Sequence, residues 1–242
     1  IALHEKLGGK LSVNSKVNVD SKEILSQVYT PGVGAVSRKI AENPSDAYKY
    51  TMKKNCVAVV SDGSAVLGLG NIGALAAIPV MEGKAVLFKQ LAGIDAFPIC
   101  LDEQDPDKLI EIIRSLHPVF GGINLEDIAA PKCFQIEDAL QNLGIPVMHD
   151  DQHGTAVVVS AALTNACRVT KKNISQMKIV INGAGAAGTA IARMLSCQDL
   201  NEQICTPVGQ VIMCDTKGAI YRGRKDLIGY KLDLAERTNP DS

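Results

Sequence analysis

Short apolar runs rich in Val and Ile alternate with longer stretches of helical pattern along most of the chain. This order is typical of α/β proteins, in which helices cover a largely parallel sheet. The runs that predict strands lie at 57–60, 85–88, 96–101, 119–125, 145–148, 177–182 and 211–214. Helices are expected at 35–54, at 106–116, around Cys133 and Phe134, at 151–168 and from residue 186 onward.

The pattern indicates two domains that meet near residue 150. A turn signal, Gly144-Ile145-Pro146, precedes a small and apolar run at 157–166 that reads as a buried helix. We therefore expect one α/β domain with a parallel-rich sheet at 1–150 and a second α/β domain at 151–242. Only one β-α-β unit and a tail follow residue 168, so we expect this second domain to be incomplete. Either the protein is a fragment, or its remaining part is not included in this sequence.

A glycine fingerprint in the second domain predicts a dinucleotide site. The run 177–182 leads into Gly183, Gly185 and Gly188, which fit GxGxxG and open an alanine-rich helix. In this motif the glycines allow a tight turn, approach to the pyrophosphate and close packing of helix on strand. The residues expected to contact the cofactor are Gly183, Gly185, Ala186, Ala187, Gly188, Asp215 and, in the preceding helix, Thr155.

The next predicted strand, 211–214, ends at Asp215. An acidic residue at this position can accept hydrogen bonds from both ribose hydroxyls, which favours NAD over NADP. Lys217 could still accommodate a 2′-phosphate, so NADP stays possible. A second GxGxxG at Gly68, Gly70 and Gly73 lacks such an acidic residue, and we interpret it as close backbone packing.

Two successive strands each end in an acidic pair. Glu126-Asp127 follows the run 119–125, and Asp150-Asp151 follows the run 145–148. Carboxyl ends of parallel strands meet at one edge of the sheet, and carboxylates gathered there suit Mg²⁺ or Mn²⁺. The alternative is that both pairs are unrelated helix N-caps. The correspondence between the two strand ends favours the metal.

Two further residues are candidates for a functional role, and for Lys84 that role would be proton transfer. Lys84 follows a glycine at the start of the predicted strand 85–88, and a lysine removed from water can act as a general base. The alternative is a surface lysine with its charge in water. Tyr29 precedes a Pro-Gly turn at 31–32, where it could instead cap an apolar cluster.

The amino-acid composition argues against several classes of partner and site. Apolar residues make up 46% of the 242 and the formal net charge is −1, which gives no electrostatic case for nucleic acid or an anionic membrane. The expected location is the cytoplasm, because no apolar run reaches membrane-spanning length. Seven scattered cysteines without a CxxC pair are interpreted as buried thiols in a reducing compartment, with no zinc site.

Six ordered motifs resemble those of malic enzymes, in particular the N-terminal two-thirds of the small, prokaryotic, NAD-dependent type. They begin at Tyr29 (YTPGVG), Ser61 (SDGSAVLGLGNIG), Glu82 (EGKAVLFK), Asn124 (NLEDI), His149 (HDDQHGTA) and Gly183 (GAGAAG). The resemblance implies oxidative decarboxylation of L-malate to pyruvate and CO₂, with NAD and with Mg²⁺ or Mn²⁺. It also suggests a homodimer. The two domains would then be a substrate and metal domain at 1–150 and an incomplete Rossmann-like, NAD-binding domain at 151–242.

The resemblance assigns roles to the candidate residues. Lys84 would take the hydroxyl proton of malate, and Tyr29 would protonate the enol at carbon 3. Glu126, Asp127 and Asp151 would ligate the metal. Asp150 would pair with Lys84.

The chain departs from the larger malic enzymes at Ala65, where they carry an arginine that grips the substrate carboxylate. Backbone amides around Gly32 and Gly70, or the side chain of Asn71, are the candidates for that contact. Two other functions stay open. One is a malolactic-type enzyme that retains NAD and releases lactate, and the other is a non-catalytic remnant that dimerises or binds nucleotide.

Overall fold

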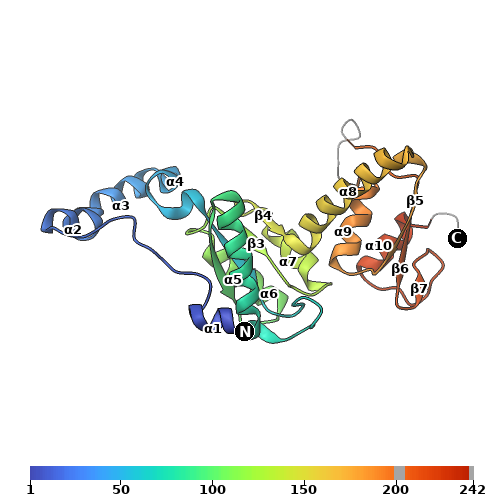
Figure 1. Cartoon of the computed structure of the whole chain (residues 1–242), viewed down its shortest axis with the longest axis horizontal. Helices are drawn as coiled ribbons and strands as arrows, with labels where there is room; N and C mark the ends of the chain where they lie inside the picture. The colour runs from blue at the N-terminus through green and yellow to red at the C-terminus, as the bar shows by residue number, and fades with distance from the viewer. Residues whose placement is uncertain (199–204, 240–242) are drawn as a thin grey trace. The chain divides into compact units, whose positions relative to one another are not determined.

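The computed structural model describes residues 1–198 and 205–239, which form two compact units. The first unit comprises 1–125 and 139–147, and the second comprises 126–138 and the residues from 148 onward. The boundary expected at residue 150 stays a prediction. Figure 1 follows the elements of both units along the chain.

The first unit is organised around a sheet with the strand order β2-β1-β3-β4. Its strands are β1 (Cys56–Ser61), β2 (Asp95–Cys100), β3 (Gly122–Leu125) and β4 (Val147–His149); of β4, only the first residue falls in this unit. β1 runs parallel to both β2 and β3. Every residue of β3 and all but one of β1 are buried. Strands covered on both faces read as continuous apolar runs, which is why the sequence predicts them well.

Helix α6 (Pro106–Leu116) shows how local sequence fixes an element. Asp105 caps its N-terminus by accepting hydrogen bonds from the backbone N–H groups of residues 107 and 108, and Pro106 occupies the first helical position. Leu109, Ile110 and Ile113 form its buried face. The bounds are those predicted from the sequence.

The strand expected at 85–88 is wrong, because these residues lie within helix α5 (Gly73–Ala92). Its buried residues, Ala74, Ala77, Met81 and Ala85, recur every three or four positions and pack toward β1 and β2. A run of four apolar residues does not by itself distinguish a strand from a buried helix. The flanking helix formers, Ala, Leu, Met, Glu and Lys, decide the outcome here. Lys84 therefore lies in mid-helix.

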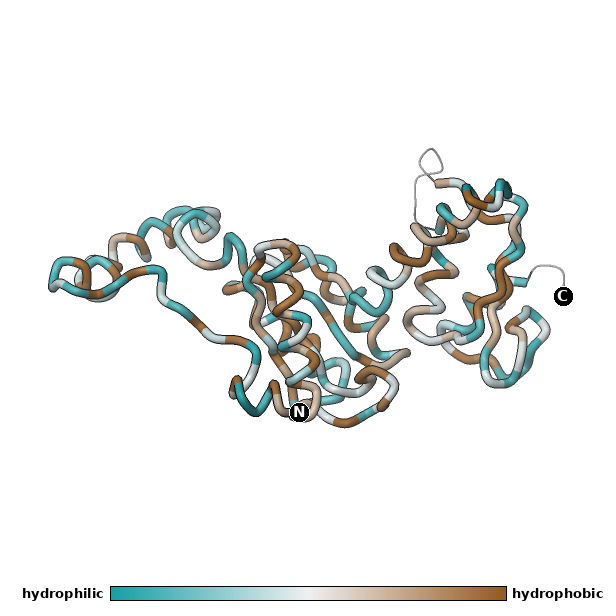
Figure 2. The backbone as a smooth tube through the Cα atoms, in the orientation of Figure 1, coloured by the Kyte–Doolittle hydropathy of each residue, from teal (hydrophilic) through white to brown (hydrophobic). Residues whose placement is uncertain are grey.

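The N-terminal segment consists of short helices: α1 (Ala2–Leu7), α2 (Lys22–Val28), α3 (Val33–Glu42) and α4 (Ala47–Tyr50). The 3₁₀ turns η1 (Pro44–Asp46) and η2 (Met52–Asn55) complete it. No residue from 1 to 50 is buried, and the structure describes all of them. Hydrophobic and hydrophilic residues are mixed along this segment (Figure 2).

The second unit contains α7 (Lys132–Leu140) except for its last two residues, which fall in the first unit. The other elements of the second unit are α8 (Asp150–Thr170), η3 (Ile174–Gln176), β5 (Lys178–Asn182), α9 (Ala186–Leu195), β6 (Gln210–Asp215), β7 (Gly218–Ala219) and α10 (Tyr230–Arg237). β5 and β6 are parallel, and β7 adds an antiparallel edge. The hydrophobic core of this unit includes Leu195 from α9 and Val211 and Met213 from β6. Mixed α/β architecture is confirmed, and the expected tail contains β7 and α10.

The interpretation of all seven cysteines as thiols is wrong for two of them. Cys197 and Cys205 form a disulfide, with their Cα atoms 5.8 Å apart. Their separation of eight positions in the sequence does not reveal this pairing. The other five, Cys56, Cys100, Cys133, Cys167 and Cys214, are free.

Among the described residues, no helix is both long enough and apolar enough to span a membrane. The cytoplasmic location stays a prediction.

Candidate metal centre and dinucleotide turn

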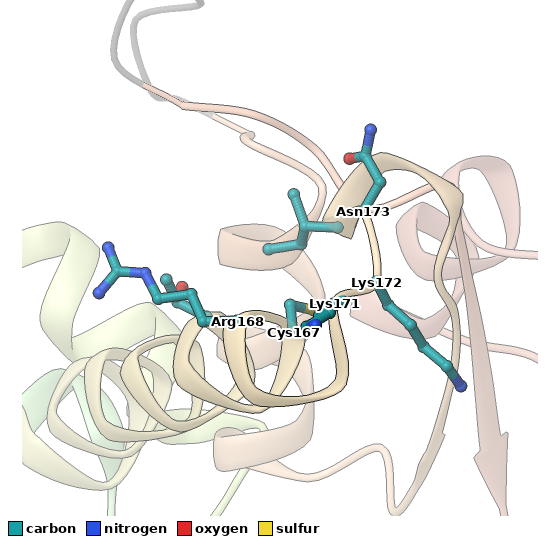
Figure 3. Close-up of a pocket in the computed structure, with 7 residues that line it drawn as sticks. Cys167, Arg168, Lys171, Lys172 and Asn173 are labelled. Atoms are coloured by element: carbon teal, nitrogen blue, oxygen red, sulfur yellow. The ribbon is translucent and has the colours of Figure 1, made fainter.

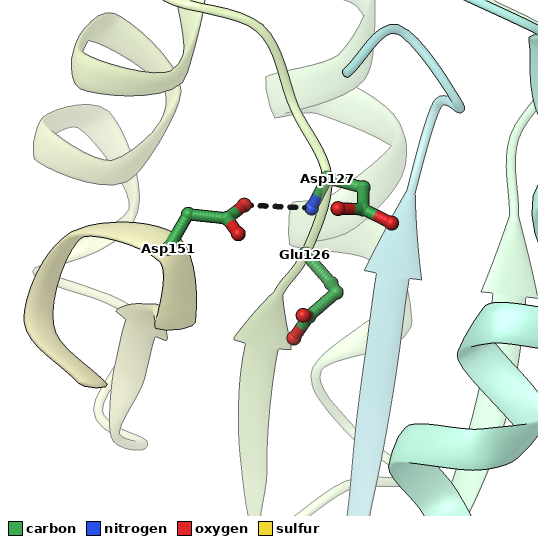
Figure 4. A group of neighbouring side chains, drawn as sticks. All are labelled: Glu126, Asp127 and Asp151. Atoms are coloured by element: carbon green, nitrogen blue, oxygen red, sulfur yellow. Dashed lines mark hydrogen bonds between the residues drawn. The ribbon is translucent and has the colours of Figure 1, made fainter. Parts of the chain in front are cut away.

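Three carboxylates from two segments come together in the second unit. Glu126, Asp127 and Asp151 each offer one oxygen, and these oxygens lie within 4.8 Å of one another. Figure 4 shows Glu126 and Asp127 on consecutive positions of one segment and Asp151 on the first turn of a helix, joined to that segment by the hydrogen bond from the Asp127 nitrogen. This is the group that the sequence predicts as the ligands of one metal ion.

Local backbone geometry brings the three side chains together. Asp127 follows β3 with a φ of 54°, in the left-handed region that Asp tolerates better than most residues. Its backbone N–H donates a hydrogen bond to Oδ2 of Asp151 at 2.9 Å. Asp151 lies in the first turn of α8, after His149 at the N-cap position, and no side chain caps the helix. Asp150 and Asp151 are therefore the first residues of the helix rather than its cap.

The donor set fits a divalent cation. Glu126 and Asp127 are buried, and carboxylates gathered away from water repel one another unless a cation or hydrogen bonds compensate. Three carboxylate oxygens are hard ligands of the kind that Mg²⁺ and Mn²⁺ prefer. Nε2 of the buried His149 lies 3.2 Å from Oδ2 of Asp151, although its ring nitrogens make no hydrogen bond.

Sequence reasoning missed Glu137, which lies next to this centre. Its buried carboxylate accepts hydrogen bonds from the His149 backbone N–H and the Gln152 side chain, both at 2.9 Å, and lies 2.7 Å from Nε2 of His153. The hydrogen bond to Glu137 raises the pKa of His153. A signal was present in the sequence, because Glu137 shares the buried face of α7 with Cys133, Ile136 and Leu140.

The expected proton-transfer residues lie in different units. Tyr29 follows α2 in the first unit and is 66% exposed, and Lys84 lies half-buried in α5 of the same unit. Asp150 belongs to the second unit, where its Oδ1 lies against Gly154, only 2.4 Å from the position of a Cβ there. The pairing of Lys84 with Asp150 stays a prediction.

Two candidates for the substrate carboxylate are already engaged in the first unit. The Gly32 N–H donates to the Ser26 carbonyl at 2.8 Å, and Asn71 exchanges two hydrogen bonds of 3.0 Å with Gln104. Close packing was also expected at Gly68, Gly70 and Gly73; a Cβ at Gly68 or Gly70 would meet no atom within 4 Å, whereas the backbone of Gly73 does pack closely on another segment. The close approach lies instead at Gly63, against the backbone of Gly73, because the loop folds back at that residue.

The glycine fingerprint of the second unit forms the expected turn. Gly183 has a φ of 131°, which favours glycine. A Cβ on Gly188 would lie 1.9 Å from the Gly183 carbonyl oxygen, so α9 packs directly on the turn. A Cβ on Gly185 would meet no atom within 4 Å, which leaves the space that a pyrophosphate needs at the N-terminus of α9. The Tyr230 hydroxyl donates to the Ala184 carbonyl and holds the turn from α10.

Asp215 ends β6 as predicted, but its carboxylate is already engaged. Arg224 donates to both of its oxygens at 2.9 Å, and Lys231 donates to Oδ2 at 2.7 Å. Arg224 and Lys231 hold the pKa of Asp215 well below its usual range. A carboxylate that is compensated in this way repels a nearby phosphate less than an isolated one would. The preference for NAD over NADP stays a prediction.

A pocket of about 350 Å³ lies at the other end of α8, where Thr164, Cys167, Arg168, Lys171, Lys172, Asn173 and Ile174 line it. A helix of 21 residues is about 30 Å long, so this pocket is remote from Asp151. The charged ends of Arg168 and Lys172 point in different directions (Figure 3). The pocket therefore offers no convergent set of groups for a ligand.

The geometry agrees with what comparison with known proteins shows. Residues 8–141 match the N-terminal domain of malic enzymes, and residues 152–241 match the malic enzyme NAD-binding domain. The chain belongs to the malic enzyme family. The resemblance stated from its motifs is thereby confirmed.

Several malic enzymes are similar over nearly the whole chain. The NAD-dependent malic enzyme of Geobacillus stearothermophilus is 52% identical over 98% of this chain and 48% of its own length. The bifunctional malic/malolactic enzyme of Bacillus subtilis is 52% identical over 99% of this chain and 57% of its own length. The crystal structure of the Thermotoga maritima NAD-dependent malic enzyme superposes with a TM-score of 0.92 at 51% identity, covering 99% of this chain and 62% of that one. The chain thus spans about half the length of these curated malic enzymes.

Proposed function

We propose that the protein oxidises L-malate with NAD and decarboxylates it to pyruvate and CO₂, with Mg²⁺ or Mn²⁺ as the metal. The observation that carries the proposal is the cluster of Glu126, Asp127 and Asp151, three hard oxygen donors within 4.8 Å. The glycine turn at 183–188 in the same unit supports the cofactor. Membership of the malic enzyme family supports the substrate.

When bound, the cation would polarise the substrate oxygen and NAD would accept the hydride. The residues of the chain would move the protons. Lys84 would take the proton of the malate hydroxyl as general base, and Tyr29 would give a proton to carbon 3 of the enol as general acid. Asp150 would pair with Lys84 and hold its amine in position.

The test measures NADH absorbance with malate and Mn²⁺, using the protein in its natural full length. We expect NADH formation that requires both additions, and a fall in kcat of at least about 100-fold in Lys84→Ala, because a general base contributes that much. Lys89→Ala is the matched control, since Lys89 lies on the same helix and forms an exposed ion pair with Asp95. Full turnover in Lys84→Ala, or no NADH from the unsubstituted protein, would refute the proposal.

A malolactic reaction is the second candidate function. The similarity to the bifunctional enzyme of Bacillus subtilis supports it. Chromatography of the products decides between the two, because the malolactic reaction gives lactate without net NADH. Lactate as the main product would replace pyruvate formation as the assigned activity.

We also propose that the protein is a homodimer whose N-terminal segment, residues 1–50, packs on a second copy. Its helices α2, α3 and α4 have 7, 10 and 4 residues. Isolated helices of such lengths are marginal in water unless an apolar face packs on another surface. Leu25 and Val28 on α2 are 49% and 40% exposed within one chain, so a face for that packing is present.

A further inference from the structure

A buried carboxylate holds the segment of chain that carries Asp151. Oε1 of Glu137 accepts a hydrogen bond from the His149 backbone N–H at 2.9 Å and lies 2.7 Å from Nε2 of His153. Oε2 accepts from the Gln152 side chain at 2.9 Å. These contacts lie two positions before Asp151 and one and two positions after it. Glu137 therefore restrains the first turn of α8 on both sides of the aspartate.

The helix that carries Glu137 also belongs to the other half of the centre. α7 begins at Lys132, a few residues after Glu126 and Asp127. A contact from α7 to residues 149–153 therefore fixes the start of α8 relative to the segment that supplies the other two oxygens. The hydrogen bond from the Asp127 N–H to Asp151 joins the same two segments at the carboxylates themselves.

We propose that Glu137 is a positioning residue for the metal, which sets the place of Asp151 relative to Glu126 and Asp127 without ligating the cation. The inference rests on the metal site of the proposed function. Groups that orient the ligands of a metal commonly contribute a factor of about 10 to 100 in metal affinity. A carboxylate with three donors around it is well suited to that task, because hydrogen bonds to a charged acceptor are short and directional.

The experiment measures Mn²⁺ binding by isothermal titration calorimetry, after chelation and dialysis, with no substrate present. We expect the Kd of the chain for Mn²⁺ to rise about tenfold in Glu137→Ala. Glu137→Asp keeps the charge but is one methylene shorter, so it cannot reach donors on both sides of Asp151 and is expected to weaken binding several-fold. Asp138→Asn is the matched control, an exposed carboxylate on the same helix that should leave the Kd unchanged.

Circular dichroism melts without metal show whether each variant is folded at the titration temperature, which separates metal affinity from stability. If Glu137→Ala does not fold, Glu137→Asp decides. Folded variants that bind Mn²⁺ as tightly as the unsubstituted chain would overturn the proposal. So would loss of folding in both variants, which would assign Glu137 to stability alone. A chain that binds no Mn²⁺ before substitution would refute the metal site itself, and hence the proposed function, so the two failures are distinguishable.

Discussion

Asp215, at the carboxyl end of β6, forms an ion pair with Arg224 through both of its carboxylate oxygens. Arg224 also pairs with Asp226, and Lys231 adds a third cation-to-carboxylate contact. The pKa of Asp215 is lowered by these partners relative to its ordinary value of 3.8. A carboxylate with a lowered pKa in the folded state stabilises the protein above its unfolded pKa, and that contribution is lost as the pH falls through the folded value.

We therefore expect the free energy of unfolding, measured by urea titration, to fall as the pH decreases below about 4. In Arg224→Leu that acid dependence should be shallower, and stability at pH 7 lower, because Asp215 loses its principal partner. Arg222→Leu is the control, since its pair with Glu236 is exposed and should add little to stability. An acid dependence in Arg224→Leu as steep as in the unsubstituted chain would contradict the linkage.

At the same scale, the sequence predicts the carboxylate cluster, whereas the helical spacing around Glu137 could have predicted its burial but not its hydrogen-bond partners. Acidic pairs at the ends of two successive strands direct attention to Glu126, Asp127 and Asp151 because parallel strands end at one edge. Glu137 is in neither pair, and its partners include a backbone N–H, which a sequence does not display. The partners of Asp215 were missed for a related reason, since Arg224 reaches it across the β6–β7 turn.

At the scale of the element, two glycines at the N-terminus of α9 should respond differently to substitution by alanine. They are Gly185, the N-cap residue, and Gly188, in the first turn. At Gly188 the new Cβ would lie 1.9 Å from the Gly183 carbonyl oxygen, so α9 would have to move off the turn. We expect Gly188→Ala to lower the free energy of unfolding by about 3 kcal/mol, the upper part of the range for overpacked positions. Thermal or urea denaturation of the chain measures this.

Gly185→Ala is the paired variant on the same turn. Its Cβ would meet no protein atom within 4 Å, and its φ of −88° suits any residue, so stability should be unchanged. The methyl group would instead occupy the space of the pyrophosphate, and NAD affinity should fall roughly tenfold or more, which is at least 1.4 kcal/mol. Equal stability losses in the two variants would show that both glycines serve packing alone.

Element prediction succeeded where burial pattern and punctuation agreed. Asp105 and Pro106 predict the start of α6, and the GxGxxG motif after an apolar strand predicts the start of α9. It failed at 85–88, where the apolar run is one part of a 20-residue helix with no turn signal before it. There the residues on both sides carried more information than the run itself.

At the scale of the molecule, the order of elements sufficed for the fold class. Strands separated by helices predict a parallel sheet, and β1 with its neighbours β2 and β3 is one. The strand order β2-β1-β3-β4 was not predicted, because adjacency depends on packing between elements distant in the sequence. The disulfide between Cys197 and Cys205 escaped prediction for a different reason, because a separation of eight positions does not by itself distinguish a bonded pair from two thiols.

The exposed N-terminal segment leads to a prediction about assembly. Along residues 1–50, all within the described part of the chain, no side chain is buried, yet α2 carries Leu25 and Val28 on its surface. If a second copy covers them, Leu25→Ser combined with Val28→Ser should remove apolar area from that interface. Each buried aliphatic side chain contributes about 1.5–3 kcal/mol, so the dimer dissociation constant should rise by roughly 100-fold or more.

Sedimentation velocity over a concentration series measures this shift in the dimer dissociation constant. Leu91→Ser, an 82% exposed leucine near the end of α5, is the control and should leave the dimer intact. A monomeric unsubstituted protein, or a double variant that dimerises as before, would show that the segment packs on something other than a second copy.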